Sequence, residues 1–207
     1  MHALRPIRIR LAFFAFALIT TVMIQKQPMP PNIDPAAYAP LLATIAKGES
    51  NGNYNAYYGN ASNGTIRLTD MSVGEVMKWQ EEYVRQGSVS SAAGKYQIIR
   101  PTLAGLVSQL RLDPRIRFDE ALQDRLAIAL LERRGAHAFV QKELTREEFA
   151  ASLAKEWAAL PKATGTNPSE SHYAGDGVNK SRVSLDEVHM ALTALQAKAL
   201  DKPGYRR

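Results

Sequence analysis

The helical spacing of apolar residues constrains the fold of this chain most strongly. Between residues 38 and 200 apolar residues recur three or four positions apart, and few segments alternate as a β-strand does. Two spacings typical of a helix capping box, Ser-x-x-Glu at 72–75 and Thr-x-x-Glu at 145–148, indicate helix starts. We therefore predict an α+β domain that is mainly helical.

One segment departs from the helical pattern. Residues 51–67 are rich in Asn, Gly and Tyr, and the pair Asn63-Gly64 is typical of a tight turn. We interpret the segment as a loop or a short hairpin. The expected architecture is thus a group of helices with a small β-hairpin lobe.

The first 25 residues predict export or membrane attachment. Three arginines precede an apolar run at residues 11–24, which only two threonines interrupt. The run is shorter than the ~20 residues that cross a bilayer comfortably, and its length matches the apolar part of a signal peptide. Because no convincing cleavage site follows, a cleaved signal and a retained anchor both stay open. We expect a periplasmic domain that is either anchored to the inner membrane or fully exported.

The remaining boundaries follow from composition. Residues 26–37 are rich in proline and predict a linker, residues 38–200 hold the main domain, and residues 201–207 form a basic tail. The net charge of +6 is not gathered into a dense stripe, so we expect no nucleic-acid partner. The chain has no cysteine and its four histidines lack metal-site spacing, so we predict neither a metal nor a cofactor.

Glu49 is the candidate catalytic residue. It lies at helical spacing from Leu41, Leu42 and Ile45, so it shares the apolar face near the end of a predicted helix. Partial burial and the negative end of the helix dipole both raise the pKa of a carboxyl group in that position. An acid that keeps its proton near neutral pH can protonate a glycosidic oxygen. A glutamate at a helix end is also commonly a solvated surface residue, which is the alternative interpretation.

Three motifs resemble those of the lysozyme-like superfamily. They are Gly-Glu-Ser-Asn-Gly-Asn-Tyr at 48–54, Ala-Ala-Gly-Lys-Tyr-Gln at 92–97 and Glu-Trp-Ala-Ala-Leu-Pro at 156–161. They are most similar to lambda-type phage endolysins and related bacterial muramidases, and the first two also resemble lytic transglycosylases. The resemblance covers roughly residues 38–195 and rests on three motifs in the right order. It implies a lysozyme-like catalytic domain that acts on the glycan strands of peptidoglycan.

The resemblance also implies roles for individual residues. Glu49 would be the catalytic acid for the β-1,4 bond between N-acetylmuramic acid and N-acetylglucosamine. Tyr96 and Gln97 would line the sugar cleft, although Tyr96 is equally compatible with core packing. Tyr54, Tyr57 and Tyr58 could stack on sugar rings, whose C–H faces suit aromatic side chains, and we expect at least one of the three to be structural. Trp157 fits an apolar helical stripe, so we assign it to the core.

The mechanism depends on a second carboxylate. A hydrolase generally uses two, and Asp70 is the first candidate after Glu49, although an acid just before a helix cap has a structural explanation that we favour. If Glu49 acts alone, the N-acetyl or 6-hydroxyl group of the substrate must assist. The enzyme would then be a lytic transglycosylase, which we slightly favour over a muramidase.

The biological role is open between phage lysis and local wall opening for a secretion apparatus. The alternative function is a catalytically inactive peptidoglycan-binding or scaffold protein of the same fold.

Overall fold

The computed structural model describes residues 32–177 and 179–201, which belong to a compact unit spanning Pro31–Arg207. The predictions for the signal or anchor segment at 1–25 and for residues 202–207 of the basic tail lie outside the described residues. None of the described helices is both long enough and apolar enough to cross a membrane.

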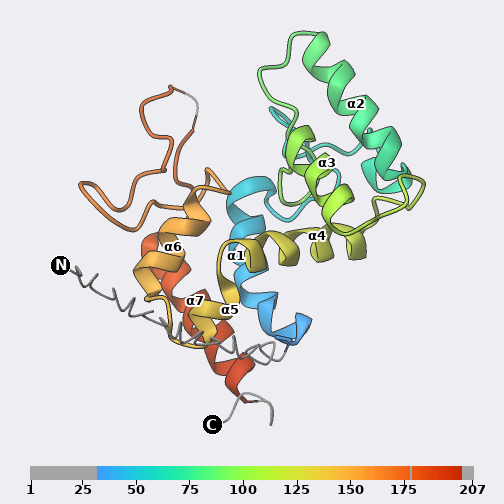
Figure 1. Ribbon diagram of the computed structural model, residues 1–207. Helices are drawn as coiled ribbons and strands as arrows, with labels where there is room; N and C mark the ends of the chain where they lie inside the picture. The colour runs from blue at the N-terminus through green and yellow to red at the C-terminus, as the bar shows by residue number, and fades with distance from the viewer. Residues whose placement is uncertain (1–31, 178, 202–207) are drawn as a thin grey trace, which may run out of the picture. The chain divides into compact units, whose positions relative to one another are not determined.

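The described residues form α-helices joined by loops and two short 3-10 helices, and they contain no extended sheet (Figure 1). The mainly helical character of the domain is therefore confirmed. In chain order the elements are η1 (Pro35–Tyr38), α1 (Ala39–Ser50), η2 (Leu68–Asp70), α2 (Val73–Arg85), α3 (Arg100–Gln109), α4 (Glu120–Arg133), α5 (Ala136–Val140), α6 (Arg146–Ala154) and α7 (Leu185–Leu200).

Local sequence signals explain where these helices begin. Ser72 accepts a hydrogen bond from the Glu75 backbone N–H, and the Glu75 side chain accepts one from the Ser72 N–H, so the capping box predicted for α2 is confirmed. Thr145 and Glu148 form the same reciprocal pair at the start of α6. Each box satisfies backbone N–H groups that have no partner inside the helix.

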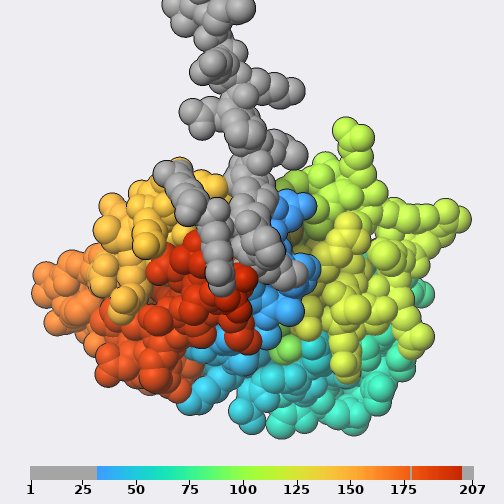
Figure 2. Space-filling model, turned by 90° about the horizontal axis from the view of Figure 1, so that it is seen from below, coloured from blue at the N-terminus to red at the C-terminus, as the bar shows by residue number. Residues whose placement is uncertain are grey.

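Helix α7 organises one group of helices. It packs against α1, η1, α5 and α6, while α2 pairs with α3, and α4 contacts both α1 and α5. Figure 1 shows α2 and α3 together on one side of the domain and α1, α5, α6 and α7 on the other. In Figure 2 the red residues of α7 lie directly beside the blue residues of α1, in agreement with their contacts.

The core begins before residue 38. Ile33 and Ala37 are buried, and Asp34 accepts a hydrogen bond from the Ala36 N–H at 2.8 Å, which opens η1. We predicted a linker over residues 26–37. In its described part, residues 32–37, the chain instead packs against the core and forms most of η1, which continues into α1.

The β-hairpin lobe is not found. Residues 51–67 contain only isolated bridges, such as the one between Tyr57 and Asn60, and no paired strands. The reason lies in the asparagine side chains. Their amides form hydrogen bonds with backbone groups that would otherwise pair with a neighbouring strand. Asn63, which is 5% exposed, donates to the carbonyls of Asn55 and Ile66 at 2.6 and 2.7 Å. Side-chain hydrogen bonds of this kind replace a ladder and fix a compact loop.

Candidate active site

A cleft of about 800 Å³ separates two sets of loops in the domain. One part of its lining comes from the end of α1 and the loops that follow α1 and α2, and it includes Glu49, Tyr57 and Tyr58. A further part of the lining comes from the segment between α6 and α7 and includes Ala159 and Arg182. The volume lies within the range of sites that hold a sizeable ligand.

Helix α1 delivers Glu49 to this cleft. The helix ends at Ser50, because Asn51 adopts a left-handed conformation with φ of 54°, which asparagine tolerates better than most residues. Glu49 therefore occupies the last turn, half-buried at the cleft wall. Its Oε1 accepts a hydrogen bond from the Ala159 backbone N–H at 3.0 Å.

Burial raises the pKa of the Glu49 carboxyl from its ordinary value of 4.5 to about 7. The Ala159 N–H and the positive charge of Arg182 oppose the shift by favouring the carboxylate, but they are the weaker effects. A group with this pKa exchanges a proton readily near neutral pH. It can serve as an acid in one step and as a base in the next.

A close backbone approach sets the contact between Glu49 and Ala159. A Cβ atom added at Gly48 would lie 2.9 Å from the Ala159 Cβ and 3.3 Å from a methyl carbon of Val183. The Ala159 carbonyl in turn accepts a hydrogen bond from the Arg182 N–H at 2.9 Å. Glycine at position 48 thus lets the end of α1 reach the segment that holds the carboxyl.

Gln97, which lies in the segment between α2 and α3, lines the same cleft. Its backbone has φ of 47°, and both its N–H and its side-chain Nε2 donate to the Gly94 carbonyl, at 3.1 and 2.8 Å. These bonds anchor the amide nitrogen at the cleft wall.

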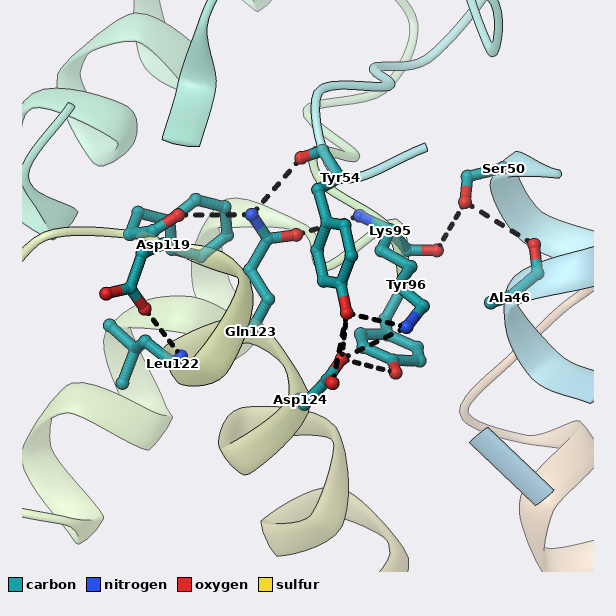
Figure 3. Close-up of polar contacts among 10 residues, drawn as sticks. Ala46, Ser50, Tyr54, Lys95, Tyr96, Asp119, Leu122, Gln123 and Asp124 are labelled. Atoms are coloured by element: carbon teal, nitrogen blue, oxygen red, sulfur yellow. Dashed lines mark hydrogen bonds and ion pairs between the residues drawn. The ribbon is translucent and has the colours of Figure 1, made fainter. Parts of the chain in front are cut away.

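Tyr54 and Tyr96 lie elsewhere. Neither lines the large cleft, and Tyr96 is only 1% exposed. Both hydroxyls donate to Asp124 of α4, Tyr54 at 3.0 Å and Tyr96 at 2.7 Å (Figure 3). The Lys95 ammonium completes the cluster by donating to the Tyr54 oxygen at 2.8 Å and to Asp124 at 3.2 Å. The Asp124 carboxylate holds both hydroxyls, so neither tyrosine offers its hydroxyl to a ligand in the large cleft.

This polar cluster connects to the end of α1. The Lys95 carbonyl accepts a hydrogen bond from the Ser50 hydroxyl at 2.7 Å, and Ser50 directly follows Glu49. Gln123 accepts from the Lys95 N–H at 2.9 Å and donates to the Tyr54 carbonyl at 3.1 Å (Figure 3). Gln123 of α4 therefore holds the turn at residues 94–97 in place. This turn also binds Ser50, the residue next to Glu49.

Asp70 is not part of the cleft lining. Its exposed carboxylate forms ion pairs with Arg117 and, at 3.7 Å, with Arg67. Two other carboxylates line the cleft with Glu49, namely Glu156 and Asp176. Sequence reasoning gave neither a role, although Glu156 begins the third motif, which was the available signal.

Both of these carboxylates are engaged. Glu156 accepts hydrogen bonds from Arg133 at 3.0 Å and from Arg134 at 2.8 Å. Asp176 accepts one from the Asn179 N–H at 2.8 Å. Across residues 32–177 and 179–201, no group of three His, Cys, Asp or Glu side chains is placed to hold a metal ion.

A half-buried acid in a polar cleft is the arrangement that general-acid enzymes use. A family model described as Endolysin matches residues 40–175 of the chain. The chain belongs to the Endolysin family, and the resemblance stated from the motifs is confirmed. Membership makes it an enzyme that degrades peptidoglycan. No curated protein and no solved structure matches the chain.

Proposed function

We propose that the protein is a glycosidase of the lysozyme-like fold that cleaves the β-1,4 bond between N-acetylmuramic acid and N-acetylglucosamine. Glu49 is the general acid. The observation that carries the proposal is a cleft-wall carboxyl whose pKa is raised to about 7 by burial. At neutral pH much of Glu49 holds a proton, which passes to the glycosidic oxygen as the bond from that oxygen to the muramic acid C1 breaks.

The engagement of the other carboxylates favours a lytic transglycosylase. Glu156 is bound by two arginines and Asp176 by Asn179, so neither stands ready to activate water. After proton donation the Glu49 carboxylate takes the proton of the muramic acid 6-hydroxyl, whose oxygen bonds to C1. The product carries a 1,6-anhydro ring, no water is consumed, and Glu49 regains its proton.

The aromatic and amide groups of the cleft suit a neutral sugar polymer. Tyr57 and Tyr58 offer ring faces, and Tyr57 is held edge-on against Trp79 at 5.4 Å and Tyr83 at 5.3 Å between ring centres. Rings held in this way can pack against the C–H faces of sugars. Gln97 and the nearby asparagines supply hydrogen-bonding groups without net charge.

Replacing Glu49 by Gln tests the assignment. We expect the clearing rate of purified cell walls to fall by about 10² to 10⁴. The matched control is Asp70→Asn, which removes an exposed carboxylate outside the cleft and should clear walls at the wild-type rate. A folded Glu49→Gln protein that clears walls as fast as the control would refute the role of Glu49.

Mass spectrometry of the released fragments separates the two mechanisms. Anhydro ends, one water lighter than reducing ends, are expected from the transglycosylase. Reducing ends would reject the 6-hydroxyl step and show that water completes the reaction in a muramidase. We also propose that residues 1–25 bring the domain to the periplasmic side of the inner membrane, and sequencing the mature N-terminus would test this.

A further inference from the structure

A second, smaller pocket adjoins the catalytic cleft. It has a volume of about 210 Å³, and Gln97, Glu156 and Tyr173 are among the residues that line both cavities. We term it the side pocket. Its volume is below the ~300 Å³ at which sites for whole small ligands begin. It therefore suits one branch of a larger molecule whose main chain occupies the cleft.

Positive charge dominates the side pocket. Arg133, Arg134 and Lys155 line it, and Glu156 is the carboxylate among its lining residues. The Glu156 side chain is only 8% exposed and pairs with both arginines. Since one carboxylate balances one of three cations, the pocket keeps an excess of positive charge that favours an anion.

A structural role accounts for only part of this charge. The bonds from Arg133 and Arg134 to Glu156 tie the end of α4 to the segment after α6. Lys155 contributes to this connection only through its backbone. Its carbonyl accepts hydrogen bonds from Arg134 at 3.3 Å and from the Tyr173 hydroxyl at 2.8 Å. Its side chain is exposed and takes part in neither bond. The ammonium of Lys155 is thus an additional positive charge that the connection between α4 and the segment after α6 does not require.

We propose that the side pocket binds the acidic peptide that branches from the muramic acid of peptidoglycan. This inference rests on the proposed function, since it requires the glycan strand to lie in the adjoining cleft. The sugar backbone of that strand is neutral, and the carboxylates of the polymer belong to its peptide branches. A cationic pocket beside a cleft with neutral polar groups matches this separation of charge. Ile99, which also lines the pocket and is 42% exposed, suits an aliphatic part of such a peptide.

The test compares two substrates for the full chain. Intact walls carry the peptides, whereas walls treated with an amidase keep the glycan and a lactyl carboxylate but lose every peptide carboxylate. The variants are Arg133→Gln, which leaves Arg134 on Glu156, and Lys155→Gln. Neither residue lines the catalytic cleft. The control is Lys198→Gln, an exposed lysine in the last turn of α7 that lines neither cavity.

On intact walls each variant should raise KM about threefold, as expected for an exposed ion pair. The double variant should raise it further, up to about tenfold, which is the product of the two single effects. On stripped walls both variants should match the wild type, and Lys198→Gln should match it on both substrates. An equal rise in KM on both substrates, or no rise on intact walls, would overturn the inference.

The two proposals fail in different ways. Wild-type protein that cleaves neither substrate would refute the glycosidase itself, and the side-pocket inference would fall with it. Wild-type protein that cleaves both, with variants that never differ from it, refutes the peptide pocket alone.

Discussion

Replacing Glu49 by Gln should make the protein more stable at neutral pH. Burial raises the pKa of this carboxyl from 4.5 to about 7, so between these values the folded protein binds more protons than the unfolded chain does. The free energy of unfolding therefore falls as the pH rises through this window. The penalty is absent below about pH 4.5 and fully present above about pH 7.

The pKa difference sets the size of the effect. It corresponds to at most about 3 kcal/mol, since each tenfold change in proton affinity is worth ~1.4 kcal/mol. Glutamine is neutral at every pH and has nearly the same shape, and its Oε1 can still accept the Ala159 N–H. We expect the Glu49→Gln protein to equal the wild type at pH 4 and to exceed it by up to about 3 kcal/mol at pH 8.

Urea unfolding at a series of pH values from 4 to 8 measures this difference. The control is Glu147→Gln, which replaces an exposed carboxylate in the first turn of α6, outside the cleft. A stability difference between Glu49→Gln and the wild type that stays constant across the series would refute the reasoning. It would mean that Glu49 titrates in the folded protein as it does in the unfolded chain.

Three further substitutions test the support of the site. Gly48→Ala should lower kcat for wall cleavage and lower the free energy of unfolding in urea by about 1 to 3 kcal/mol. The reason is that the added carbon lies 2.9 Å from the Ala159 Cβ. An unchanged kcat would contradict this prediction. Asp124→Ala should lower the free energy of unfolding by about 1 to 3 kcal/mol, because it leaves the largely buried Lys95 without its carboxylate. A midpoint of unfolding equal to that of the wild type would show that the cluster contributes no stability. Asp70→Asn removes only exposed ion pairs, so its unfolding free energy should change by less than about 1 kcal/mol.

The sequence by itself determined where helices such as α2 and α6 begin and where the candidate acid lies along the chain. Apolar spacing and capping residues act within a few positions, so they predicted α2 and α6 with their capping boxes. The same local pattern placed Glu49 at the end of an amphipathic helix. The motif order then indicated the family that the family model confirmed.

Only the tertiary structure decided which groups meet. The N–H that binds Glu49 belongs to a residue 110 positions away, and Tyr54 reaches Asp124 across 70 positions. No local pattern records such pairings, because they depend on how the helices pack. The same limit explains the absent hairpin, since turn residues can end a ladder or, as Asn63 does here, bind the backbone in place of one. Burial is a property of the packed domain, and it is burial that lets a carboxyl keep its proton near neutral pH.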